Sequence, residues 1–135
     1  KIITREMSAF SKYLFASLDL NLIHKRRVNN WKTLNNFFNK SLLNTSLIAP
    51  IYQNDENINT PLTYPVKIQS SQRESILKKL RGRKVFCPIH WRLPKTSNKN
   101  LLEDYKLSKE IFSIPIDQRL SKDSMNSLIE ILISI

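Results

Sequence analysis

The chain has 135 residues, 41% of them hydrophobic, which is enough for one domain with its own core and excludes a disordered polypeptide. It carries 22 basic and 11 acidic residues, and a net charge of +11 could attract a polyanion, although a lysine-rich surface explains it more simply. A single glycine, Gly82, excludes the glycine-rich phosphate loops of Walker and Rossmann enzymes.

Targeting signals are missing from the sequence. No stretch reaches the roughly 18 apolar residues of a membrane span, and the first residues lack the layout of a signal peptide. Cys87 is the only cysteine, so the chain has no internal disulfide. We expect a cytoplasmic protein without a membrane partner. Because the chain begins with Lys1, we also expect it to be a piece of a longer protein.

Residues 1–40 are expected to form a long helical lead-in, and residues 46–135 a sheet-and-helix layer, together one small domain. Apolar residues recur at helical spacing along the lead-in, and Asp19 and Asn21 predict a bend or break near residues 17–22. The apolar positions are Leu14, Leu18, Leu22, Val28, Trp31, Leu34 and Phe38.

Two strands are expected next, at residues 46–52 and 61–69, separated by the polar loop "QNDENINT". Their spacing predicts an antiparallel hairpin. Proline has no backbone N–H to donate, so Pro65 predicts that the second strand lies at a sheet edge or contains a bulge.

A helix is expected to follow, opened by Ser71 with Glu74 as its capping-box partner. Ile76, Leu77 and Leu80 supply its buried face. Gly82 is expected to end it in the left-handed conformation.

The remaining chain is expected to contain a strand at residues 84–91 ("KVFCPIHW"), a helix from Asn100 to Phe112 with Glu103 as capping partner, a short extended stretch at 113–116, and a final helix capped by Ser121. The last helix has a core-facing stripe of Met125, Leu128, Ile129, Leu132 and Ile133. The fold class is therefore α+β: a small, mostly antiparallel sheet backed by helices.

Residues 87–92 contain the chain's most reactive side chains, and three kinds of site were weighed there. A zinc site needs about four ligands, and Cys87, His90 and the distant His24 are too few. A Cys/His nucleophilic pair is disfavoured because alternating strand side chains place Cys87 and His90 on opposite faces. A nucleic-acid platform remains open, because "HWR" combines aromatic and basic groups.

Longer motifs resemble a known family. "CPIHWRLPK" (87–95) followed by "LSKEIFSIPIDQRLSKDSMNSLIEIL" (107–132) resembles the C-terminal part of the DegT-type sugar aminotransferases, pyridoxal-phosphate (PLP) enzymes of the aspartate aminotransferase fold. Residues 11–38 resemble the helix that leads from the family's large domain into its small one, with Arg27, Asn29 or Asn30, Trp31 and Leu34 in the family's register.

The resemblance implies a division of labour. The family's large domain supplies the Schiff-base lysine, the aspartate at the pyridinium nitrogen and the phosphate loop, and none of their motifs occurs here. We therefore expect no catalytic, cofactor-binding or metal-binding residue in this chain. The family's small domain lends a wall to the substrate cleft, and His90, Trp91 and Arg92 are expected to face a nucleotide-sugar there. Arg119 is expected to pair with Asp117 or Asp123.

The sequence thus predicts the C-terminal small domain of a PLP-dependent nucleotide-sugar aminotransferase homologue, inactive alone, whose partner is a large PLP-binding domain or a dimer mate. The alternative is a basic, non-enzymatic module for nucleic acid or another polyanion.

Overall fold

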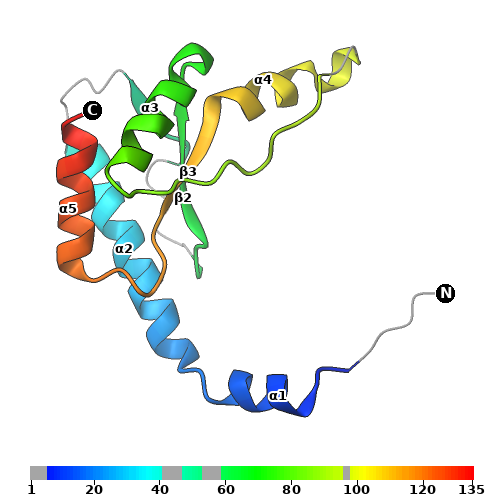
Figure 1. Ribbon diagram of the computed structural model, residues 1–135, viewed down its shortest axis with the longest axis vertical. Coiled ribbons are helices and arrows are strands. Elements are labelled where there is room, and N and C mark those ends of the chain that lie inside the picture. The colour runs from blue at the N-terminus through cyan, green and yellow to red at the C-terminus, as the bar shows by residue number, and fades with distance from the viewer. Residues whose placement is uncertain (1–5, 41–46, 53–58, 96–97) are drawn as a thin grey trace.

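The structure is a computed structural model that describes residues 6–40, 47–52, 59–95 and 98–135. It has the expected α+β class, with helices around a small antiparallel sheet (Figure 1). The elements are α1 (Ala9–Ala16), α2 (Leu20–Lys40), β1 (Ile48–Pro50), β2 (Thr63–Ile68), α3 (Ser70–Gly82), the 3₁₀ turn η1 (Lys99–Leu101), α4 (Leu102–Glu110), β3 (Ile111–Pro115) and α5 (Lys122–Ile133). None of the described helices is long and apolar enough to cross a membrane.

The helical lead-in breaks where the sequence predicted. The Asp19 carboxylate accepts a hydrogen bond of 2.9 Å from the Leu22 N–H and so starts α2 as a separate helix. Further along α2, Trp31 and Leu34 are buried in the core. α1 projects away from the rest of the molecule (Figure 1).

The sheet has the order β1-β2-β3, with both pairs antiparallel, so the expected hairpin is confirmed. Pro65 does not mark an edge: it lies in the central strand. Its carbonyl accepts from the Ile51 N–H at 3.3 Å, just beyond the end of β1, so the donor that proline lacks faces the side where the β1 ladder has ended. The central position is therefore tolerated because β1 is short.

The core lies on one face of this sheet. Tyr64, Val66 and Ile68 alternate along β2 toward that face, and Phe112 and Ile114 of β3 pair beside them. α2 and α5 pack together over the same core, to which α5 contributes Met125, Leu128 and Leu132. The Ser121 cap of α5 is confirmed, since its hydroxyl accepts from the Ser124 N–H at 3.1 Å. The expected stripe is wrong at its end, because Ile133 is largely exposed.

The termini of α3 differ from the expectation. Gln69, not Ser71, precedes the first turn, without a side-chain cap bond. At the other end the left-handed residue is Lys84 (φ 63°), not Gly82. The Val85 N–H donates to the Leu80 carbonyl at 2.9 Å, and Val85 packs on the core. This Schellman-type ending runs two residues beyond Gly82 because that length brings Val85 against the apolar face of the helix.

The boundary between α4 and β3 also moves. α4 ends at Glu110, and Ile111 and Phe112 belong to β3, because Phe112 is fully buried opposite Val66. Asn100 caps nothing; the Asn98 side chain accepts from the Asn100 N–H and starts η1.

The two polar residues of the family-like register in α2 anchor loops. Arg27 donates to the Gln118 side chain at 3.0 Å and to the Pro61 and Leu62 carbonyls at 3.1 and 3.2 Å. Both loops are thereby tied to α2.

Candidate functional site

Residues 84–95 run along the free edge of β3. The Ser113 N–H, which points away from β2, donates to the Pro88 carbonyl at 2.9 Å. Cys87 and Ile89 pack against the core, whereas Phe86 on the other side is 67% exposed. The segment therefore acts as an extended fourth edge of the sheet.

The expected strand at residues 84–91 does not form as a regular strand. Pro88 has no N–H, and the segment makes a single backbone hydrogen bond to β3 in the described structure. The predicted alternation holds as far as Ile89 and then fails, because Trp91 leaves the core face and is 62% exposed. The end of the ladder frees Trp91 for contact with something else.

His90 is positioned by β3. Its Nδ1 lies 3.3 Å from the hydroxyl oxygen of Ser113, which is buried, and its ring packs against Trp91 with centroids 5.2 Å apart. The Ser113 bond fixes the ring through Nδ1 and leaves Nε2 as the nitrogen that can meet a ligand.

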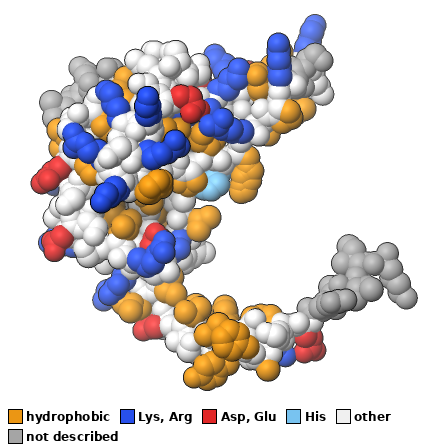
Figure 2. Space-filling model, in the orientation of Figure 1, with side chains coloured by type: hydrophobic (Ala, Val, Ile, Leu, Met, Phe, Trp, Pro, Cys, Tyr) orange, Lys and Arg blue, Asp and Glu red, His pale blue; other side chains and the backbone are white. Residues whose placement is uncertain are grey.

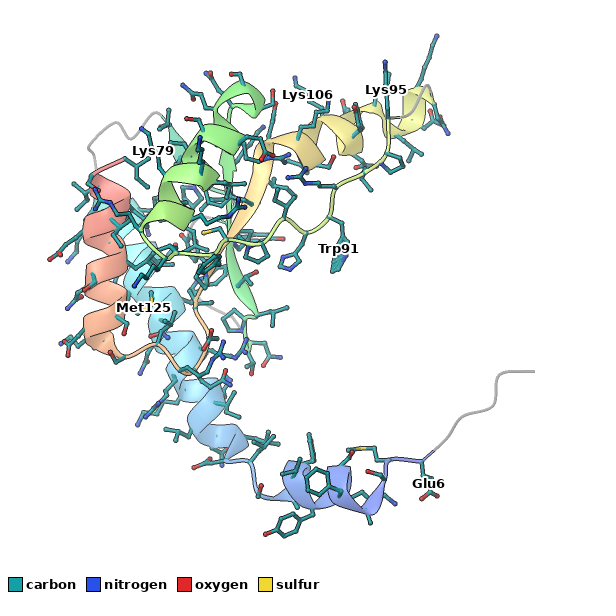
Figure 3. All side chains as sticks on the ribbon, viewed as in Figure 1. Glu6, Lys79, Trp91, Lys95, Lys106 and Met125 are labelled. Atoms are coloured by element: carbon teal, nitrogen blue, oxygen red, sulfur yellow. The ribbon has the colours of Figure 1, made fainter. Side chains whose placement is uncertain are left out.

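Trp91 projects from the segment toward the hollow between α4 and α1 (Figure 3). The space-filling view shows the same hollow, with apolar side chains on both sides of it (Figure 2). His90 and Trp91 are thus brought together at the border of an open space.

Arg92 is turned toward α3. Its Nη2 lies 3.1 Å from Oε1 of Glu74, and both side chains are largely exposed. The same carboxylate oxygen lies 3.4 Å from Nη2 of Arg73. A phosphate that reaches Arg92 would therefore compete with Glu74 for it.

A groove separates residues 90–95 from α4, with a volume of about 820 Å³. We call it the α4 groove; its walls are mostly apolar, formed by His90, Trp91, Leu93, Pro94, Lys95, Leu101, Asp104, Tyr105, Leu107, Ser108 and Ile111. The α4 side chains of this groove were missed from the sequence. A signal existed in the i, i+3, i+4 and i+7 spacing of Leu101, Asp104, Tyr105 and Ser108, which places them on one helix face.

Arg73 supports the groove from behind. It is only 7% exposed, and its Nη1 donates to the Ser108 carbonyl at 2.6 Å and to the Ile111 carbonyl at 3.3 Å. These acceptors lie at the C-terminal end of α4, where a helix leaves carbonyls unsatisfied. The signal for this role was a charged residue in register with the apolar face of α3.

The Cys/His pair does not form. His90 bonds to Ser113, and burial raises the pKa of the Cys87 thiol to about 12, so the thiol stays protonated. Among the described residues, no group of three His, Cys, Asp or Glu side chains could hold a metal ion.

The described residues do not fit PLP on their own. The cofactor needs a lysine for its aldehyde and a carboxylate for its ring nitrogen, both within an enclosed site. The buried polar residues of the described chain are Asn30, Arg73, Ser108 and Ser113, with no lysine or aspartate among them. No catalytic step can therefore be assigned to this chain.

The expected pairing of Arg119 is confirmed with Asp117. Two side-chain contacts of 3.0 and 3.1 Å and a backbone N–H bond of 2.9 Å join them. The hydrogen bond from Arg119 is the main cause that lowers the pKa of Asp117. This pair shapes a turn and has no partner in the α4 groove.

No protein-family model and no curated protein matches the chain. Solved structures do match. They include sugar aminotransferase CalS13 from Micromonospora echinospora (TM-score 0.66, 16% identity, 86% of this chain and 31% of that one) and NtdA from Bacillus subtilis with bound cofactor PMP (TM-score 0.70, 16% identity, 85% and 28%). A DegT/DnrJ/EryC1/StrS aminotransferase from Brucella abortus matches with TM-score 0.60 and 14% identity, over 83% and 31%.

The chain has the fold of one part of a sugar aminotransferase. The resemblance to the DegT type read from the sequence is confirmed at the level of the fold. The chain spans less than a third of the length of these aminotransferases. The comparisons give no support to the alternative of a basic module for polyanions.

Proposed function

We propose that this chain is the C-terminal small domain of a PLP-dependent nucleotide-sugar aminotransferase homologue. The observation that carries the proposal is the match of 83–86% of this chain to aminotransferases that are more than three times as long. The remainder of such an enzyme would hold the cofactor, for which the described residues offer no site.

In this proposal His90 and Trp91 form a wall of the substrate cleft. The half-buried imidazole, fixed through Nδ1 by Ser113, presents Nε2 to the sugar or its phosphates, and the exposed indole packs against a ring of the substrate. Arg92 binds a phosphate after exchanging Glu74 for it, a step that suits a bidentate guanidinium.

Transamination itself belongs to the large domain or to a dimer mate in the cytoplasm, and the chain alone is silent. The test uses the polypeptide purified with its native flanking sequence and incubated with PLP. Borohydride reduction followed by peptide mass spectrometry locates the modified lysine. We expect stoichiometric label on a lysine outside these 135 residues; label on a lysine within them, or no label at all, contradicts the proposal.

Substitutions test the cleft wall in the same enzyme. His90→Ala and Trp91→Ala are each expected to raise KM for the nucleotide-sugar about tenfold and to lower kcat less, because they remove ground-state binding. Phe86→Ala is the matched control, an exposed aromatic four residues before His90 in the same segment. A KM unchanged by both site variants would remove His90 and Trp91 from the cleft.

A further inference from the structure

The N-terminal end of the molecule exposes an unusual run of large apolar side chains. They are 44–71% exposed and lie in α1, on either side of it and at the start of α2. We call them the N-terminal apolar ridge: Met7, Phe10, Tyr13, Leu14, Phe15, Leu18, Leu20 and Leu22.

α1 has nothing within the described chain to stabilise it. It has eight residues, and none of them is buried. Isolated helices shorter than about 12–15 residues are marginal in water, and most helical stability in proteins comes from packing. The helix therefore needs a surface from another body.

The shape of the ridge limits what this body can be. With 3.6 residues per turn, Tyr13, Phe10, Leu14, Leu18 and Phe15 spread over about 200° of the helix circumference. A helix that is apolar around more than half of its surface is buried on more than one side. The partner must therefore hold α1 in a groove and not merely meet it on a flat face.

Charge separates the ridge from the rest of the chain. Residues 6–22 contain one basic residue, Lys12, and two acidic residues, Glu6 and Asp19, whereas the whole chain has a net charge of +11. Lys12 is already paired with Glu6 at 2.9 Å. A membrane-surface helix has a strongly basic polar face. The ridge lacks one, which favours an apolar protein groove.

α1 also borders the hollow into which Trp91 projects from the opposite side (Figure 3). A single body that fills the hollow would meet both. We propose that this body is the cofactor-binding domain of the same enzyme, and that it holds the N-terminal apolar ridge in an apolar groove. This inference rests on the proposed function, and the matching aminotransferases have more than two thirds of their length left over to form such a body.

Hydrogen exchange measured by mass spectrometry tests the inference in two samples: the 135-residue chain, which has its own core, and the polypeptide with its native flanking sequence. We expect the amides of residues 10–18 to exchange without protection in the isolated chain and at least 100-fold more slowly in the longer polypeptide. Equal rates in both samples would overturn the inference. So would protection in the isolated chain that rises with its concentration, since a second copy would then be the occupant.

Variants and the lysine label separate the possible failures. Phe10→Ser with Phe15→Ser should reduce the protection of α1 in the longer polypeptide at least tenfold, whereas Phe86→Ser, an equally exposed phenylalanine outside the ridge, should not. PLP label on a lysine of the flanking sequence combined with an unprotected α1 would refute the docking and leave the proposed function standing. Absence of label would refute both.

Discussion

Asn30 shows how one side chain can organise the sheet-to-helix connection. It is buried, and its Nδ2 donates to the carbonyls of Asp117 at 3.0 Å and of Ile116 and Leu120 at 3.3 Å. Asn30→Ala removes the donor from all three acceptors, so we expect a loss of about 1–3 kcal/mol in the free energy of unfolding, measured by urea denaturation.

Asn29→Ala is the control for this prediction, because Asn29 is the exposed neighbour on the same helix. Its cost should stay within about 0.5 kcal/mol. Equal effects of the two substitutions would mean that the Asn30 bonds contribute nothing specific.

The pair of Asp117 and Arg119 predicts a dependence of stability on pH. Because the folded pKa of Asp117 lies below its ordinary value, its contribution is present above the unfolded pKa of about 4 and is lost as the pH falls through the folded pKa. Arg119→Ala should therefore reduce the difference in unfolding free energy between pH 6 and pH 2.5. Arg83→Ala, another exposed arginine, is the control, and an unchanged pH slope in Arg119→Ala would refute the coupling.

At the scale of elements, Arg73 ties α3 to the end of α4. Arg73→Met should destabilise the protein by about 1–3 kcal/mol, because the carbonyls of Ser108 and Ile111 lose a charged donor. Hydrogen exchange should accelerate in α4 and the start of β3 more than in α2 and α5. Arg81→Met, two turns further along α3 and exposed, is the control; uniform acceleration over the whole chain would contradict a local anchoring role.

The elements also show what periodicity can and cannot predict. Helical spacing correctly placed α2, α3 and α5, because each buries one apolar stripe. It failed at Pro65 and Lys84, whose conformations depend on partners elsewhere: the early end of β1 and the docking of Val85 on the core. For the same reason the sequence placed His90 and Trp91 in one segment but did not identify the opposite wall on α4.

For the whole molecule, the exposed α1 predicts that stability and association are separable. Deletion of residues 1–16 should change the unfolding free energy of the isolated chain by less than about 0.5 kcal/mol, because α1 contributes no buried residue. The deletion should also lower the binding of a hydrophobic dye and raise solubility. A large loss of stability on deletion would show that α1 packs on its own domain.

The fold as a whole was within reach of the sequence, but its open side was not. Apolar periodicity predicts which helix face is buried without specifying whether the covering surface belongs to the same domain. Leu14, Leu18 and Leu22 were therefore grouped with Trp31 and Leu34 in one stripe, although only Trp31 and Leu34 reach the core.

Cys87 gives the molecule a built-in reporter. With a pKa near 12, only about one thiol in ten thousand is ionised at pH 8, so an alkylating reagent should react with the native protein far more slowly than with a free cysteine. Any event that peels residues 84–95 from the edge of β3 would restore an ordinary thiol. The alkylation rate of this one sulfur would then time the detachment of the segment that holds His90 and Trp91.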